Sequence, residues 1–252
     1  MIDVRYKGKL KICILDNREA LGEKAAKDAA EIIKELLSKN NEINVAFAAA
    51  PSQDETLRYL LKDDDIEWER INAFQLDEYC KFGLDKKGSF ANYLNIHIFS
   101  KVTFNKIYYI CCEDDYASIV KNHPFDVVFL GIGENGHIAF NDPSFAKFDE
   151  KEILKKVKLD ERSRLQQVND GCFPSLDDVP TEAKTLTIPP IMASKYIICS
   201  VPGIRKAEAV KEALYGPISE KCPASIMRRH MHGNIYLDKE SASLLEDELG
   251  EN

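Results

Sequence analysis

Residues 125–137 have the sequence FDVVFLGIGENGH, in which a run of apolar and β-branched residues leads directly into a turn with three glycines. The first half is typical of a central parallel strand that is buried on both faces. The glycines let a ligand approach the N–H groups of the turn. Because ligands of open α/β sheets bind beyond the carboxyl ends of strands, this turn predicts a binding site beside His137. An isolated histidine is more often an ordinary surface or core residue, so other segments must decide.

Strands and helices alternate on both sides of this segment. Upstream, each predicted strand is followed by a helical pattern, and downstream the alternation is less regular. No linker rich in Pro, Gly or Ser divides residues 1–252. The pattern predicts a single-domain, doubly wound α/β fold, a Rossmann-like arrangement with a mainly parallel sheet and helices on both faces. The strands are expected at 10–15, 43–49, 71–76, 106–110, 185–188, 195–201 and 234–237, with an amphipathic helix at 204–214.

Composition limits the classes of partner. The chain has 252 residues, of which 44% are hydrophobic and 30% charged, and its net charge of -8 argues against nucleic acid as a partner. An anionic substrate would need a locally basic pocket within this acidic surface. Seven cysteines without metal-ligand spacing favour a reducing compartment. No segment approaches the roughly 20 apolar residues of a membrane span, so we expect a cytoplasmic protein without a membrane partner.

Two adjacent carboxylates follow the strand predicted at 71–76. Residues 74–79 read FQLDEY, which delivers Asp77 and Glu78 to the same sheet edge as His137. Since neighbouring side chains on a strand point in opposite directions, only one of the two is expected to face a pocket there. Both could instead be solvated loop acids.

Cations stand beside two further predicted element ends. Arg164 belongs to the segment ERSR at 161–164, and Lys206 lies in the first turn of a predicted helix. Free N–H groups and the helix dipole favour an anion at such a turn, and an ammonium adds a point charge. Ser52 follows another strand and could hold a phosphate, although helix capping alone would explain it. The pair His230 and His232 lacks further nearby ligands, so no metal site is predicted.

The segments at 74–79, 131–143, 159–164 and 203–206 together resemble the glucosamine-6-phosphate deaminase/isomerase family, in the same order along the chain. The resemblance covers nearly the whole length. The stretch HIAFN at 137–141 separates this branch from the related 6-phosphogluconolactonases.

The resemblance implies a sugar-phosphate substrate, aldose-ketose isomerisation of a 2-amino hexose 6-phosphate, and release of ammonia. By position His137 matches the residue that opens the sugar ring, and Asp77 matches the carboxylate that moves the C2 proton. Arg164 and Lys206 match the phosphate-binding cations, and Ser52 completes the phosphate cradle. No cofactor is implied, because the open-chain carbonyl acidifies the C2 proton. The resemblance does not fix the oligomeric state, and a homo-oligomer is one of the states that it leaves open.

The chain departs from the family pattern around the histidine and in the phosphate turn. Asn135 stands where the best-known deaminases carry an aspartate, and Asp142 where they carry a glutamate. Asn135 can still orient the imidazole ring, whereas Asp142 reaches it only if the turn is drawn in. Pro51 removes one N–H donor from the phosphate turn. Two rival functions are a lactonase-type hydrolase, with His137 activating water, and a sugar-phosphate sensor without catalysis.

Overall fold

The computed structural model describes residues 2–245. Its larger sheet has the strand order β1-β2-β11-β10-β7-β3-β4-β6. Only β1, at one edge, is antiparallel to its neighbour, and the other pairings are parallel. The mainly parallel sheet predicted from the sequence is therefore confirmed. The strands are β1 (Asp3–Lys7), β2 (Leu10–Leu15), β3 (Ile43–Phe47), β4 (Ile71–Gln75), β6 (Lys106–Tyr108), β7 (Val127–Leu130), β10 (Tyr196–Val201) and β11 (Gly233–Asp238).

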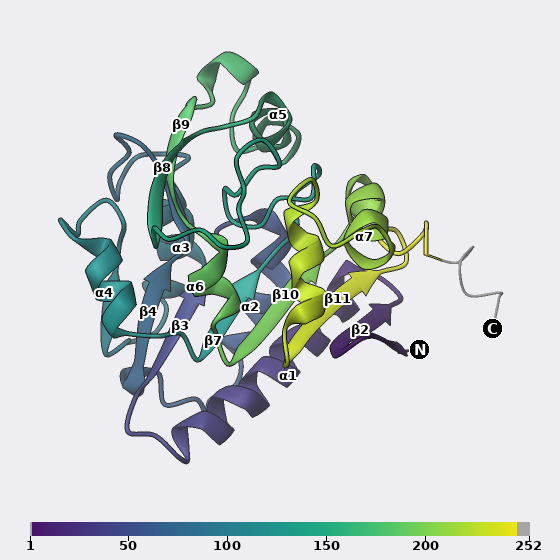
Figure 1. Cartoon of the computed structure of the whole chain (residues 1–252). Helices are drawn as coiled ribbons and strands as arrows, with labels where there is room; N and C mark the ends of the chain where they lie inside the picture. The colour runs from purple at the N-terminus through teal and green to yellow at the C-terminus, as the bar shows by residue number, and fades with distance from the viewer. Residues whose placement is uncertain (1, 246–252) are drawn as a thin grey trace.

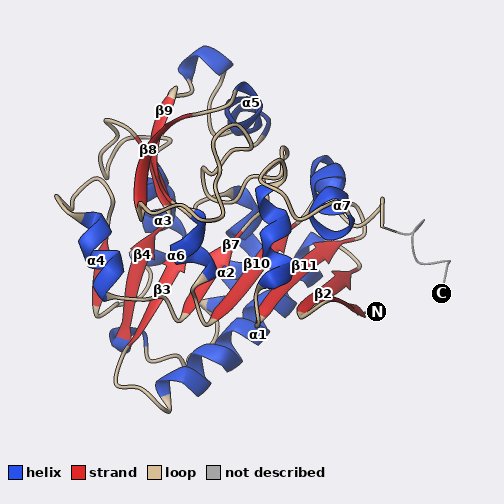
Figure 2. Cartoon of the chain, in the orientation of Figure 1, coloured by secondary structure: helices blue, strands red, loops and turns tan. Residues whose placement is uncertain are grey.

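Helices cover both faces of this sheet (Figure 2). One apolar cluster joins one face to α1 (Arg18–Leu37), α2 (Asp54–Leu60) and α3 (Phe90–Leu94). The other cluster joins the opposite face to α4 (Tyr116–Asn122), α6 (Ile188–Met192) and α7 (Ala207–Tyr215). Single-turn helices are η1 (Pro51–Gln53), η2 (Trp68–Arg70), η4 (Leu176–Asp178) and η5 (Ile204–Lys206); η6 (Pro223–Arg229) is longer, and the π-helix η3 (Asn95–Phe99) continues α3.

Helix α1 packs on the sheet through apolar residues that are evenly spaced in the sequence. Leu21, Ala25, Ala29 and Ile33 recur at helical spacing, and all four are buried against the sheet. The side chain of Asn17 accepts a hydrogen bond from the Ala20 N–H and so caps the first turn. The start of α1 is thereby fixed directly after β2.

A smaller antiparallel sheet has the order β5-β9-β8. Together with α5 it lies at one end of the molecule, beyond the larger sheet (Figure 1). Asp77 and Glu78, which follow the strand predicted at 71–76, belong to this smaller sheet. The strand expected at 185–188 ends at Leu186, and Ile188 begins α6. The elements are β5 (Asp77–Tyr79), β8 (Leu154–Lys158), β9 (Glu182–Leu186) and α5 (Glu161–Asn169).

Four of the strands and α-helices, β1, β8, α5 and α6, were not predicted from the sequence. The pattern of α5 is uninformative because its buried residues are polar: Ser163, Gln166 and Gln167. Strand β8 buries only Val157 fully among basic neighbours. Among residues 2–245, no helix is both long and apolar enough to cross a membrane.

Candidate active site

A cavity of about 290 Å³ lies beyond the carboxyl ends of β3, β7 and β10. The turns after these three strands supply Ser52, His137 and Lys206 to its wall. Asp77 reaches the same cavity from the first position of β5. Four of the residues singled out in the sequence therefore meet around one space.

The glycine turn after β7 is shaped around the imidazole ring. A Cβ atom at Gly133 would lie 2.1 Å from a ring carbon of His137, so any side chain there would displace the histidine. Gly136 has a φ of +84°, in the region that favours glycine. The Gly133 N–H donates to the His137 carbonyl over 2.9 Å and closes the turn. These glycines place His137 at the cavity.

Three oxygen atoms surround Nδ1 of His137. It lies 2.7 Å from Asn135 Oδ1, 2.9 Å from Ser163 Oγ and 3.2 Å from Asp142 Oδ1. Because the amide oxygen and the carboxylate can only accept, the hydrogen-bond network assigns the proton of a neutral imidazole to Nδ1. Nε2 is then left as the basic nitrogen.

Asp142 is completely buried behind this histidine. It accepts hydrogen bonds from the Asp160 N–H at 2.9 Å, from Asn135 Nδ2 at 3.1 Å and from the Ser163 hydroxyl. Burial alone would raise the pKa of Asp142, but its contacts with His137, Ser163 and the backbone outweigh burial, and the pKa is lowered. The shorter aspartate therefore stays ionised and reaches the ring. Ser163 connects the two side chains.

Asp77 and Glu78 have different surroundings, as strand alternation predicted. Asp77 is 6% exposed, lines the cavity and makes no side-chain hydrogen bond within the described residues. Burial, and secondarily the charge of Glu78, raises the pKa of Asp77 well above its ordinary value. Glu78 accepts hydrogen bonds from Phe90 N at 3.1 Å and from Ala91 N at 2.8 Å, at the start of α3. Asp77 is thus the carboxylate available as a base.

Residues 16–237 match the model of the glucosamine-6-phosphate isomerase/6-phosphogluconolactonase family. The chain belongs to this family. A glucosamine-6-phosphate deaminase of Listeria innocua is 36% identical over 228 residues, which cover 87% of this chain and 95% of the relative. A glucosamine-6-phosphate deaminase of Enterococcus faecalis is 33% identical over 236 residues, covering 90% and 98%.

Solved structures agree with the family assignment. A monomeric glucosamine-6-phosphate deaminase superposes with a TM-score of 0.81 at 31% identity, covering 92% of this chain and 99% of that one. The 6-phosphogluconolactonase of Thermotoga maritima superposes with a TM-score of 0.73 at 20% identity, covering 92% and 100%. The second likeness concerns the fold alone.

Lys206 provides a buried cation on the cavity wall of this family member. The residue is 7% exposed, and its ammonium has no hydrogen bond or ion pair to other residues of 2–245. Burial lowers the pKa of Lys206, although Asp170 and Glu134 oppose that shift. Ser52 lies on the wall as well, where its hydroxyl accepts from Gln53 Nε2 at 3.1 Å. An unpaired ammonium that lines the same cavity as a hydroxyl suits an anionic ligand.

Arg164 does not line the cavity. Its Nη2 donates to the carbonyl oxygens of Leu176 at 2.6 Å and Val179 at 3.0 Å, so the guanidinium holds the turn at η4. Ser163 and Arg164 are successive residues of α5, and successive side chains diverge by about 100° around a helix. With Ser163 facing His137, Arg164 faces elsewhere.

Two other arginines line the cavity, and the sequence reasoning did not select either. Arg205 forms ion pairs with Glu134 at 3.1 Å and with Asp170 at 3.2 Å, so two carboxylates offset its charge. Arg18 enters from the first turn of α1, far from any motif of the site. Ser163 was also missed, although it lies within the segment ERSR that drew attention to Arg164. The only sign of a role in the sequence is that this hydroxyl-bearing residue stands between two charged residues.

Proposed function

We propose that this protein isomerises and deaminates an amino hexose 6-phosphate, either glucosamine 6-phosphate or galactosamine 6-phosphate, to the ketohexose 6-phosphate and ammonia. The relatives named glucosamine-6-phosphate deaminase support this substrate class. The observation that carries the proposal is the pair Asp77 and His137 on one cavity wall, each available for proton transfer.

Nε2 of His137 acts first by taking the proton of the C1 hydroxyl and giving it to the ring oxygen, which opens the sugar ring to the aldehyde. An imidazole can give and take a proton near neutral pH. The carboxylate of Asp142 stabilises the imidazolium of His137 when it forms. It does so through the direct contact at 3.2 Å and through Ser163. Nε2 both takes and gives the proton because Nδ1 is held by oxygen acceptors.

Asp77 then removes the C2 proton, and the electron pair moves toward the C1 carbonyl. Returning the proton to C1 leaves an imine at C2. Water adds to this imine and ammonia departs, so the reaction consumes one water and needs no oxidant. Burial favours this step, because the pKa of Asp77 is raised and its carboxylate is a stronger base than in water.

Two further expectations belong to this proposal. We infer that residues 1–252 form a single domain and that the protein works in the cytoplasm. All seven cysteines are free thiols, which favours a reducing environment.

A coupled assay tests the function. Glucosamine 6-phosphate, galactosamine 6-phosphate and neutral hexose 6-phosphates are supplied separately, and ammonia and ketose phosphate are followed independently, with Asp77→Asn and His137→Ala as controls. Equal amounts of both products, lost in both variants, are expected. Acid release from 6-phosphogluconolactone without ketose would make the protein a lactonase. Ligand binding without C2 proton exchange in deuterium oxide would make it a sensor.

A further inference from the structure

We propose that Arg18 is a substrate-binding residue that shares the phosphate group with Lys206. This inference rests on the proposed function, because it assumes that the ligand carries a phosphate.

Arg18 lies at the cavity because two helices approach each other closely. A Cβ atom at Gly22 of α1 would lie 2.2 Å from the Cβ of Glu55 in α2, so only glycine permits this approach. The contact brings the first turn of α1 beside the turn at Pro51. Arg18, Ser52 and Lys206 then line one cavity.

The phosphate turn itself offers few donors. Pro51 has no N–H, and the Gln53 N–H is already bonded to the Ala50 carbonyl at 2.8 Å. The charge of Arg205 is offset by two carboxylates, whereas Arg18 is paired with one, that of Glu55. Lys206 is a single ammonium whose pKa is lowered by burial. A phosphate with nearly two negative charges therefore needs a second cation, and a guanidinium keeps its charge in any such site.

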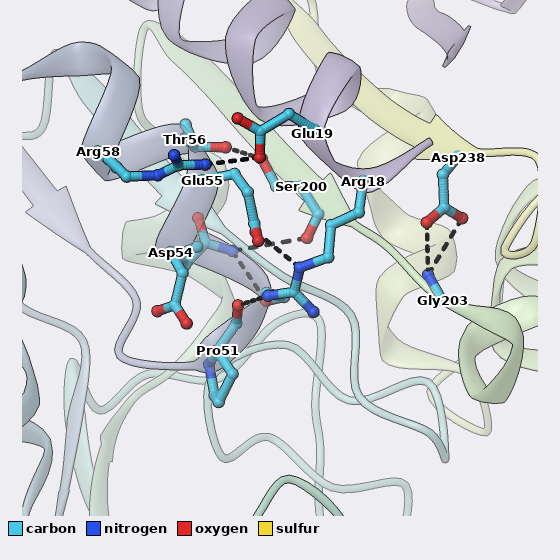
Figure 3. A network of polar contacts seen from close by, with 12 residues as sticks. Arg18, Glu19, Pro51, Asp54, Glu55, Thr56, Arg58, Ser200, Gly203 and Asp238 are labelled. Atoms are coloured by element: carbon cyan, nitrogen blue, oxygen red, sulfur yellow. Dashed lines mark hydrogen bonds and ion pairs between the residues drawn. The ribbon is translucent and has the colours of Figure 1, made fainter. Parts of the chain in front are cut away.

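The guanidinium of Arg18 is held in place yet keeps one end free. Its Nη2 donates to the Pro51 carbonyl, and its Nε lies 2.7 Å from Glu55 Oε2 (Figure 3). Within residues 2–245 the third nitrogen, Nη1, has no partner. The side chain is 42% exposed, so this end is accessible to a ligand. An arginine whose rotamer is already fixed loses little entropy when it binds an anion.

The test compares Arg18→Ala and Arg18→Lys with Arg58→Ala. Arg58 is a matched control, because it is also an exposed arginine paired with a single carboxylate, Glu19, and it lies outside the cavity. Steady-state kinetics with glucosamine 6-phosphate give kcat and KM, and calorimetry gives the affinity for inorganic phosphate. Thermal unfolding of each variant verifies its folding.

For Arg18→Ala we expect a rise in KM of about ten- to a hundred-fold, the usual range for losing a charged hydrogen bond, with kcat nearly unchanged. The affinity for inorganic phosphate should fall in parallel, Arg18→Lys should recover part of both losses, and Arg58→Ala should behave as wild type. An unchanged KM in folded Arg18→Ala would overturn the inference. The inference would also be overturned if Arg205→Ala alone produced the same rise in KM and the same loss of phosphate affinity.

The two proposals fail separately. If wild-type protein releases no ammonia but loses phosphate affinity through Arg18→Ala, the inference holds and the proposed reaction is wrong. If ammonia is released and Arg18→Ala changes neither KM nor phosphate affinity, the reaction stands and Arg18 has no part in binding.

Discussion

Two groups of residues around the cavity are built differently. In the group proposed for proton transfer, Asp77, His137 and Asp142 are all less than 10% exposed, and the side chains behind the histidine are joined in one hydrogen-bond network. In the group proposed for anion binding, Lys206 is buried, but the side chains of Arg18 and Arg205 are 42% and 54% exposed. The first group is enclosed, and the arginines of the second face solvent.

The difference shows which parts of such a site can be exchanged. A buried polar network is costly if one member lacks its partner, so the residue types around His137 are closely constrained. Exposed cations interact through water, so a cation at such a place can be supplied from different positions in the sequence. The proposed phosphate contact from α1 is an arrangement that the solvent-exposed group permits.

Asp77→Asn changes the enclosed group and should have the largest effect. An amide cannot accept the C2 proton, so kcat should fall by about 10²- to 10⁴-fold with KM changed little. Ammonia and ketose release measure the loss. In the wild type, kcat should decline as acid protonates Asp77, at a pH above the ordinary aspartate range because burial and Glu78 raise its pKa. A variant with more than a tenth of wild-type activity would exclude Asp77 as the base.

Ser163→Ala tests the link between His137 and Asp142. The change removes the hydroxyl that bonds both side chains, while Asn135 continues to hold Nδ1. We expect kcat to fall about ten- to a hundred-fold, as is usual when a group that orients a functional side chain is lost. The pH profile of kcat should also shift, whereas a purely structural role would lower thermal stability and leave that profile in place.

Arg164→Ala separates the two arginines named for phosphate binding. Because the guanidinium bonds to the Leu176 and Val179 carbonyls, its loss should cost about 1–3 kcal/mol of unfolding free energy and change KM by less than about two-fold. Denaturant unfolding and substrate titration measure these quantities. A large rise in KM without loss of stability would return Arg164 to the phosphate site.

Asp77→Asn should also stabilise the protein modestly, through linkage. Burial and Glu78 raise the pKa of Asp77 on folding. The contribution of Asp77 to the free energy of unfolding is therefore fully present below its unfolded pKa and is lost as the pH rises through its folded pKa. The variant should therefore unfold a few degrees higher than wild type at pH 8, and the gain should vanish near pH 4. Differential scanning calorimetry at both pH values decides; an equal shift at both would contradict the linkage.

The sequence predicted most of the large sheet and singled out Asp77 and His137, because both depend on local patterns. Strand β7 was evident from its apolar run, and His137 from the glycines that follow this strand. Arg18 could not be predicted, since it lies 119 residues before His137 in sequence and meets the cavity only through the packing of α1 on α2. Strand β8 and α5 were missed because their patterns lack regular apolar residues. Arg164 was favoured over Ser163 because charge is conspicuous in a sequence and helix rotation is not.

The position of Asp77 has a mechanical consequence. The residue follows the end of β4 in the large sheet by two positions, yet it pairs with Thr185 in the small one. His137 and Lys206 are carried by turns of the large sheet. Any displacement of one sheet against the other therefore changes the separation of Asp77 from His137 and Lys206. Substitutions at the contact of β5 with β9 would alter turnover without touching the ligand.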